Sequence, residues 1–113
     1  MQHVVTDADT ATALGSGEVA VLATPRVIAW LEGATVAAAR AGLAAGQTTV
    51  GTAVRIRHRR PTPVGGTVEV TADPPTGDGT TLTFTVSAVD ADGRVVADGE
   101  IDRAVVDAAS FGA

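Results

Sequence analysis

The chain has 113 residues, of which 45% are hydrophobic, and a formal net charge of −5 at pH 7. This length predicts a single domain, residues 1–113, with a core large enough to need no cross-links. The absence of cysteine excludes disulfide bonds and thiolate metal sites, and the acidic balance argues against a general nucleic-acid-binding protein.

The N-terminal region opens with MQHVVTDADT, which lacks the basic and apolar segments of a signal peptide. Two short stretches in this region, residues 3–6 and 18–23, have the composition of strands. We therefore expect a region without an export signal that contributes short strands to the fold.

A long helix is expected next, over residues 24–46. Thr24 is a favourable N-cap residue, and Pro25 suits the first helical position because its missing N–H needs no partner there. Gly46, or Gly42 before it, is a suitable C-terminal stop.

This expected helix is apolar on nearly every face, so it should be buried by its own chain, by a partner, or by both. Its apolar stretch, residues 27–45, is interrupted by Glu32 and Arg40 and is too polar to span a bilayer. Together with the lack of a signal peptide, this predicts a cytoplasmic protein with no membrane partner.

The residues after the helix change to the period-two alternation that is typical of strands. Turn-forming sequences separate the alternating segments: PTPVGG, PPTGDG and ADGR, of which the last contains the hairpin signal Asp92-Gly93. The expected strands are residues 48–58, 66–73, 80–90 and 94–107.

This order of elements predicts an α+β fold in which an antiparallel sheet wraps around one central helix. The strands carry Thr, Asp and Glu on one face and Val, Leu and Ile on the other, so one face of the sheet should be solvated. A sheet of this size leaves the far side of the helix uncovered. We therefore expect a homodimer, or a higher oligomer built from it, that covers this side.

The stretch RIRHRR, residues 55–60, holds four of the eight arginines and one of the two histidines. The strand period of two predicts that one set of residues shares the inward face: Thr52, Val54, Ile56 and His58. His58 is therefore expected to point toward the helix. It is either a satisfied, partly buried histidine or a proton-transfer group.

The arginines of this stretch are expected to lie on the solvated face and to balance the acidic chain. The alternative is that Arg59 or Arg60, at the end of the strand, binds a phosphate-bearing ligand such as coenzyme A. Nucleic-acid binding is a weaker hypothesis because no aromatic stacking residues accompany the arginines. No Gly-rich phosphate loop and no paired-histidine metal spacing occur, so neither a metal nor a further cofactor is expected.

Two residues of the expected helix are further candidates. Glu32 is the only acid between Glu18 and Glu69, and it lies among apolar neighbours. It is either a helix-edge residue paired with an arginine or a functional carboxylate held near His58. Thr24 is either a helix cap alone or part of a site at the helix N-terminus, where backbone N–H groups suit a developing oxyanion.

The chain resembles the hotdog-fold thioesterases and, within them, the fluoroacetyl-CoA thioesterase-like group. The resemblance covers nearly the full length, and its core is the pair of segments ATPRVIAWLEGA and VGTAVRIRHRRPTPVGGTVEVTAD. In that group a threonine precedes the helix, a glutamate lies eight residues on, and a histidine ends the next strand. Those positions are Thr24, Glu32 and His58 in this chain, and the glycine of the group's GT pair matches Gly51.

The resemblance implies a hotdog fold and hydrolysis of an acyl-CoA thioester at the edge of a homodimer interface. It implies His58 as general base and acid, Glu32 as an orienting, activating or attacking carboxylate, and Thr24 as nucleophile or positioner of water. Gly51 would let the backbone approach the acyl group. The resemblance does not rank these routes.

The chain departs from the group in two respects. Pro25 follows Thr24 directly, and the aromatic lid residues associated with fluoroacetyl selectivity have no evident counterpart. We therefore expect the fold and the reaction class, but not the fluorinated substrate. The alternative is a non-catalytic hotdog protein that binds acyl-CoA, whereas a hotdog hydratase is disfavoured because neither histidine lies in a suitable Asp-containing motif.

Overall fold

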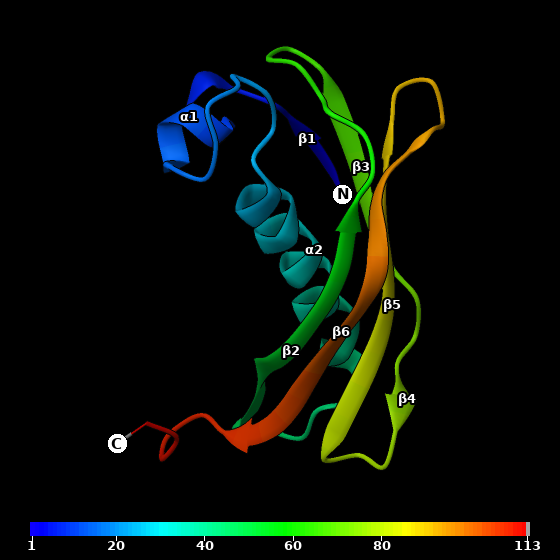
Figure 1. The fold of residues 1–113 in the computed structure, drawn as a ribbon. Coiled ribbons are helices and arrows are strands. Elements are labelled where there is room, and N and C mark those ends of the chain that lie inside the picture. The colour runs from blue at the N-terminus through cyan, green and yellow to red at the C-terminus, as the bar shows by residue number, and fades with distance from the viewer. Residues whose placement is uncertain (113) are drawn as a thin grey trace.

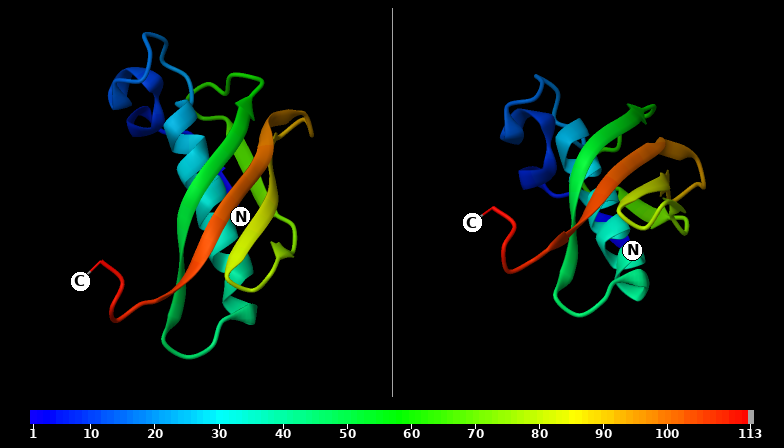
Figure 2. Two further views of the ribbon diagram at one scale, coloured as in Figure 1. Left: turned by 60° about the horizontal axis from the view of Figure 1, so that its bottom comes forward. Right: turned by 90° about the horizontal axis from the view of Figure 1, so that it is seen from below.

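The computed structural model describes residues 1–112, which form a curled antiparallel sheet around a long helix (Figure 1). The elements in chain order are β1 (Gln2–Val4), η1 (Asp7–Asp9), α1 (Ala11–Leu14), α2 (Thr24–Ala39), η2 (Arg40–Gly42), β2 (Gln47–His58), β3 (Thr67–Ala72), β4 (Thr76–Gly77), β5 (Thr81–Asp90) and β6 (Val95–Asp107). Two further views show α2 lying along the concave face of the sheet (Figure 2). The predicted α+β architecture is confirmed.

The sheet has the strand order β1-β3-β5-β6-β2, with β4 paired to β5, and every pairing is antiparallel. The four long strands predicted from alternation are confirmed to within one residue at each end. Gly93, at a φ of 79°, forms the expected turn between β5 and β6. The two-residue β4 was not expected because it lies within the turn-forming PPTGDG sequence.

Helix α2 begins at Thr24, but the prediction that Thr24 is its N-cap is wrong. Ala23 occupies that position with an extended backbone, so the Thr24 hydroxyl is not used for capping. The regular helix ends at Ala39, and η2 continues to Gly42, the earlier of the two expected stops. Gly46, at a φ of 82°, instead forms the turn into β2.

The N-terminal region differs most from the prediction. The first expected strand is present as β1, but residues 18–23 form no strand and make only isolated bridges, from Leu22 to Thr10 and from Val21 to Pro63. Leu22 is 1% exposed, and its N–H donates to the carbonyl of Thr62 at 2.8 Å. The apolar pattern here therefore reflects burial of an irregular segment rather than strand pairing.

The core fills the space between α2 and the concave face of the sheet. Its largest fully buried side chains come from both layers: Leu31, Val27, Phe84, Ile101, Val68 and Val70. The opposite side of α2, with Ala29, Gly33 and Ala37, is exposed, as expected for a helix that its own sheet covers on one side only.

Candidate active site

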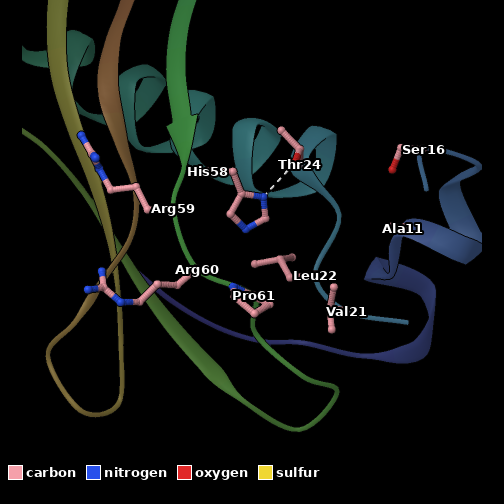
Figure 3. A pocket seen from close by; sticks show the side chains of 9 residues that line it. All are labelled: Ala11, Ser16, Val21, Leu22, Thr24, His58, Arg59, Arg60 and Pro61. Carbon is pink, nitrogen blue, oxygen red and sulfur yellow. Dashed lines mark hydrogen bonds between the residues drawn. The ribbon is translucent and has the colours of Figure 1, made fainter. Parts of the chain in front are cut away.

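Thr24 and His58 meet at the N-terminal end of α2. Thr24 is the first residue of α2 and His58 the last of β2, and Thr24 Oγ1 lies 2.8 Å from His58 Nδ1 (Figure 3). Both residues line a cavity of about 270 Å³ together with Ser16, Leu22 and Pro61. The prediction that His58 points toward the helix is confirmed, and the pair is a hydroxyl beside a base, an arrangement that can activate a nucleophile.

The surroundings of His58 favour its neutral form. Burial lowers the pKa of His58 below 6.5, and a backbone hydrogen bond with Arg60 acts in the opposite direction. The ring is held through Nδ1, while Nε2 is buried and has no hydrogen-bond partner within residues 1–112. At neutral pH the imidazole is therefore uncharged and able to accept a proton.

Glu32 belongs to a second cluster, in the middle of α2. Arg103 Nη1 donates to Glu32 Oε2 at 3.2 Å. Arg103 is only 6% exposed, and its remaining donors bind Thr49, with Nε on the hydroxyl at 2.8 Å and Nη2 on the carbonyl at 3.1 Å. The two bonds to Thr49 hold the guanidinium against the inner face of the sheet, and one charge-assisted hydrogen bond from it fixes the carboxylate.

Gly51 makes room for this carboxylate. A Cβ added at Gly51 would lie 2.6 Å from Glu32 Oε2. Since Gly51 and His58 are seven positions apart, a regular strand would point them to opposite faces. The register between β2 and β6 shifts between Gly51 and Ala53, and this bulge turns both residues inward. The prediction that Thr52 shares the inward face is therefore wrong, because the bulge removes Thr52 from the alternation.

The two clusters are separate within one chain. Thr24 and Glu32 are eight residues apart on α2, roughly 12 Å along the helix axis. Glu32 is bonded to Arg103, whereas His58 is bonded to Thr24. The structure therefore brings Thr24 together with His58, and Glu32 together with Gly51, at two places seven residues apart along β2, which we call the His58 end and the Gly51 end.

The arginines of β2 lie on the outer face in a charged ladder with β6. Arg55 pairs with Glu100 and Asp102, and the Arg55 guanidinium is the main cause that lowers the pKa of Asp102 to about 2. Arg59 Nε lies 2.8 Å from Asp98 Oδ1. The expectation of charge balance on the solvated face is confirmed for Arg55 and Arg59.

Arg59 and Arg60 also border the cavity beside Thr24 and His58. Their guanidinium groups point away from His58 (Figure 3), and Arg60 Nη1 donates to the carbonyl of Val95 at 2.7 Å. Arg60 forms no ion pair with the residues that the structure describes. A role of Arg59 or Arg60 in ligand binding stays a prediction.

Arg103 is the site residue that sequence reasoning missed. It alternates with Ile101 and Val105 along β6 and so occupies a position on the apolar, inward face. An arginine at such a position is rarely buried without a partner, and this was the available signal. Its partners, Glu32 and Thr49, come from two other elements.

Two kinds of feature are not found in residues 1–112. No three His, Cys, Asp or Glu side chains of this part are grouped so that they could hold a metal ion. Nor does this part contain a helix that is both long and apolar enough to cross a membrane.

Comparison with known proteins assigns the chain to a family. The sequence model of the fluoroacetyl-CoA-specific thioesterase family, FlK, matches residues 5–109. The chain belongs to this family. No curated protein matched the sequence.

Solved structures with the same fold include FlK itself. A crystal structure of a phenylalanine-to-alanine mutant of FlK, in complex with fluoroacetate and CoA, shares 30% identity with this chain. The match covers 98% of this chain and 91% of that chain, with a TM-score of 0.88. A hot-dog-like protein from Thermanaerovibrio acidaminovorans is 25% identical, over 95% of this chain and 78% of that chain, with a TM-score of 0.79.

A thioesterase superfamily member from Thermus thermophilus, described as a hypothetical protein, has the same fold. It is 24% identical over 96% of this chain and 80% of that chain, with a TM-score of 0.86. The FlK-family chain is thus a hotdog-fold protein and a thioester hydrolase, which confirms the predicted fold and enzyme class.

Proposed function

We propose that the protein is a cytoplasmic acyl-CoA thioesterase that works as a homodimer, with Thr24, His58 and Glu32 carrying the reaction. The observation that carries this proposal is the 2.8 Å contact between Thr24 Oγ1 and His58 Nδ1 beside a cavity. Membership of the FlK family supports thioester chemistry, and the FlK complex with fluoroacetate and CoA supports an acyl-CoA as the substrate class.

In the first step, Thr24 Oγ1 bonds to the thioester carbonyl carbon while His58 Nδ1 takes the hydroxyl proton. The lowered pKa of His58 leaves the ring neutral and ready to accept this proton. The backbone N–H of Thr24 stabilises the oxyanion that forms, because Pro25 has no N–H and the N–H groups of Arg26 and Val27 donate to the carbonyl of Ala23. The C–S bond then breaks, the proton passes from His58 to the CoA sulfur, and the acyl group stays on Thr24.

In the second step, water replaces the acyl group on Thr24. His58 takes a proton from the water as its oxygen bonds to the ester carbonyl carbon. The bond to Thr24 Oγ1 breaks, the proton returns to that oxygen, and the carboxylic acid leaves. Glu32 orients the water through its second carboxylate oxygen, because Oε2 is held by Arg103.

The homodimer brings Glu32 into the same site. Strand β2 lies at the edge of the sheet and pairs only with β6 within the described residues. An antiparallel pairing of two β2 edges sets the Gly51 end of one strand beside the His58 end of the other. Glu32 of one chain then faces Thr24 and His58 of the partner, and two chains form two sites.

Two further residues take predicted roles at this site. Gly51 keeps the Glu32 carboxylate in position and lets the acyl group approach the backbone. Arg60, which is free of ion pairs in the described chain, meets a phosphate of CoA at the cavity mouth, and Arg59 contributes less because Asp98 holds it.

Thiol release from acyl-CoA esters, from acetyl to dodecanoyl, tests this function. Thr24→Ala, His58→Ala and Glu32→Gln, each verified as folded by circular dichroism, should lower kcat/KM by at least ~10²-fold, the size expected for losing nucleophilic or acid–base help. Arg57→Ala, on the outer face, is the matched control and should leave turnover unchanged.

The outcomes separate the alternatives. Turnover that survives Thr24→Ala would exclude Thr24 as the nucleophile and leave attack by water or by Glu32. If wild-type protein hydrolyses no ester but calorimetry shows CoA binding, the alternative of a non-catalytic acyl-CoA-binding protein replaces the thioesterase.

A further inference from the structure

A second cavity lies at the end of α2 that is remote from Thr24. It measures about 520 Å³, which is in the range of ligand-binding pockets. Its lining is apolar or glycine throughout, in contrast to the mixed polar and apolar lining of the cavity beside His58, and includes Ala39, Gly42, Leu43, Pro75, Leu82 and Val105. We call this cavity the apolar groove. Figure 2 shows the C-terminal end of α2 beside the start of β5, where the groove lies.

The sheet side of the groove is continuous with the Glu32 cluster. Leu82 of β5 is the cross-strand neighbour of Arg103, which binds the Glu32 carboxylate. Val105 of β6 is the cross-strand neighbour of Thr49, which accepts two hydrogen bonds from Arg103. Since inward residues two positions apart on a strand are roughly 7 Å apart, the groove begins directly beside the residues that hold the carboxylate.

The helix side of the groove is continuous with the same cluster. Glu32, Thr35 and Ala39 follow one another at helical spacing on one face of α2. Thr35 and Ala39 are buried, and the Thr35 hydroxyl donates to the carbonyl of Glu32 at 2.6 Å. Ala39, which lines the groove, lies roughly 10 Å along the helix axis from Glu32.

We propose that the apolar groove holds the tail of the acyl group, so that the preferred substrate is a medium-chain acyl-CoA rather than acetyl-CoA or a halogenated analogue of it. This inference rests on the proposed function. A thioester carbonyl between Glu32 of one chain and the partner's His58 would direct its acyl tail past Arg103 into the groove. The CoA part would leave in the opposite direction, toward Arg60. Acetyl-CoA is too short to reach the groove.

The chemistry of the groove selects a flexible apolar chain. Its walls offer aliphatic side chains, proline rings and glycine backbone, and no charged side chain lines it. Each methylene group that enters should raise kcat/KM about three- to fourfold, because it exchanges water for apolar surroundings. The gain should stop once the tail fills the groove.

The experiment compares octanoyl-CoA with acetyl-CoA as substrates of the full-length protein. Wild type should show a ratio of kcat/KM values that favours octanoyl-CoA by at least ~10²-fold. Leu82→Trp fills the groove and should lower this ratio at least tenfold. Thr85→Trp places the same side chain on the outer face of the same strand and should leave the ratio at the wild-type value. If Leu82→Trp does not fold, Leu43→Trp at the rim takes its place.

Binding of S-octyl-CoA, a thioether that cannot be hydrolysed, gives a readout independent of activity. Calorimetry should show tenfold weaker binding of S-octyl-CoA to Leu82→Trp than to wild type, with binding of S-methyl-CoA little changed. The proposed role of the groove is wrong if wild type prefers acetyl-CoA, or if Leu82→Trp leaves the octanoyl-to-acetyl ratio unchanged. In either case the protein is still a thioesterase. If no ester is hydrolysed, the proposed function fails, and the S-octyl-CoA comparison alone supports or overturns the groove.

Discussion

The two halves of the proposed site lie seven residues apart along β2, one at its last residue, His58, and one around Gly51. At the His58 end, a neutral ring is held by one hydrogen bond to Thr24 and faces a cavity. At the Gly51 end, the Glu32 carboxylate is held by a buried arginine that makes three hydrogen bonds to Glu32 and Thr49. In the proposed reaction the first half transfers a proton, and the second holds a carboxylate in a fixed position.

This difference explains how each half is built. A charge in a partly buried place is costly unless it is paired, so the Gly51 end is constructed like part of the core, with Arg103 only 6% exposed. A hydroxyl and a neutral imidazole carry no such cost, so the His58 end can stay open to ligand. In the proposed reaction the His58 half exchanges protons with the substrate, while Arg103 keeps the Glu32 carboxylate in place.

The largest expected effect comes from mixing two inactive variants, which tests whether the halves work together across the dimer. Thr24→Ala and Glu32→Gln should each be inactive alone. After refolding as an equal mixture, half of the dimers combine the two chains, and each such dimer has one intact site. Thiol release should therefore recover to about a quarter of the wild-type activity, as random pairing of two chain types requires.

A second mixture controls for this recovery. Thr24→Ala and His58→Ala both damage the His58 end, so every site in their mixed dimers contains one defect, and activity should stay at the level of the single variants. Recovery in neither mixture, when native mass spectrometry shows mixed dimers, would mean that one chain supplies a whole site.

Gly51→Ala should have the next largest effect, because it disturbs the Glu32 carboxylate and leaves the contact between Thr24 and His58 unchanged. The added Cβ would lie 2.6 Å from Glu32 Oε2, so the carboxylate must move. A displacement of this size should lower kcat about 10- to 100-fold, with little change in the melting temperature. Ser87→Thr adds one methyl group on the outer face of β5 and should leave kcat unchanged. Normal kcat in Gly51→Ala would show that the position of Glu32 does not matter to the rate-limiting step.

The sequence predicted the His58 end of the site much better than the Gly51 end. Period-two alternation located the long strands and pointed His58 inward, and the Thr-Pro pair marked the start of α2. These signals are local, since each depends on neighbours a few residues away. Glu32 was singled out as the lone acid among apolar neighbours, and the resemblance to a known family added Gly51, but neither signal gave the geometry of these two residues.

The parts of the fold and the site that were not predicted depend on features that local sequence patterns do not encode. One bulge at Thr52 reverses the face of every residue before it, and nothing in the composition of β2 marks the bulge. The pairing of Arg103 with Glu32 joins residues 71 positions apart. Leu22, in the segment wrongly predicted as a strand, is buried by packing, and burial alone does not distinguish a strand from irregular chain.

A smaller effect is expected from the arginines at the cavity mouth. Arg60→Ala should raise KM for acyl-CoA about three- to tenfold with kcat retained, because it removes a guanidinium that no carboxylate of residues 1–112 holds and that can therefore pair with a CoA phosphate. Arg59→Ala should raise KM less, because Asp98 already holds that side chain at 2.8 Å. The difference should shrink in high salt. An equal rise in KM with an N-acetylcysteamine thioester, which has no phosphate, would contradict this role.

The smallest expected effect distinguishes the consequences of protonating His58 from those of protonating His3. The His3 ring stacks on Trp30, with centroids 4.3 Å apart and planes 3° apart. Burial, and then the charge of the N-terminal amine, lower the pKa of His3, while Asp9 and Glu69 oppose them.

Both histidines are therefore less easily protonated in the folded chain than in the unfolded one. Between each lowered pKa and 6.5 the unfolded chain binds more protons, so the free energy of unfolding should fall as the pH is lowered through this interval. Below the folded pKa values this contribution should level off.

His3→Phe keeps a flat ring against Trp30 and removes one of the two histidines whose protonation changes the free energy of unfolding. Urea unfolding between about pH 7.5 and 5 should then show a weaker pH dependence of the free energy of unfolding than in wild type. The fall of kcat/KM on acidification should keep its midpoint, because that loss belongs to His58 as the general base. A shifted midpoint in His3→Phe would mean that the group controlling activity senses His3, and that the His58 end of the site extends to the N-terminal strand.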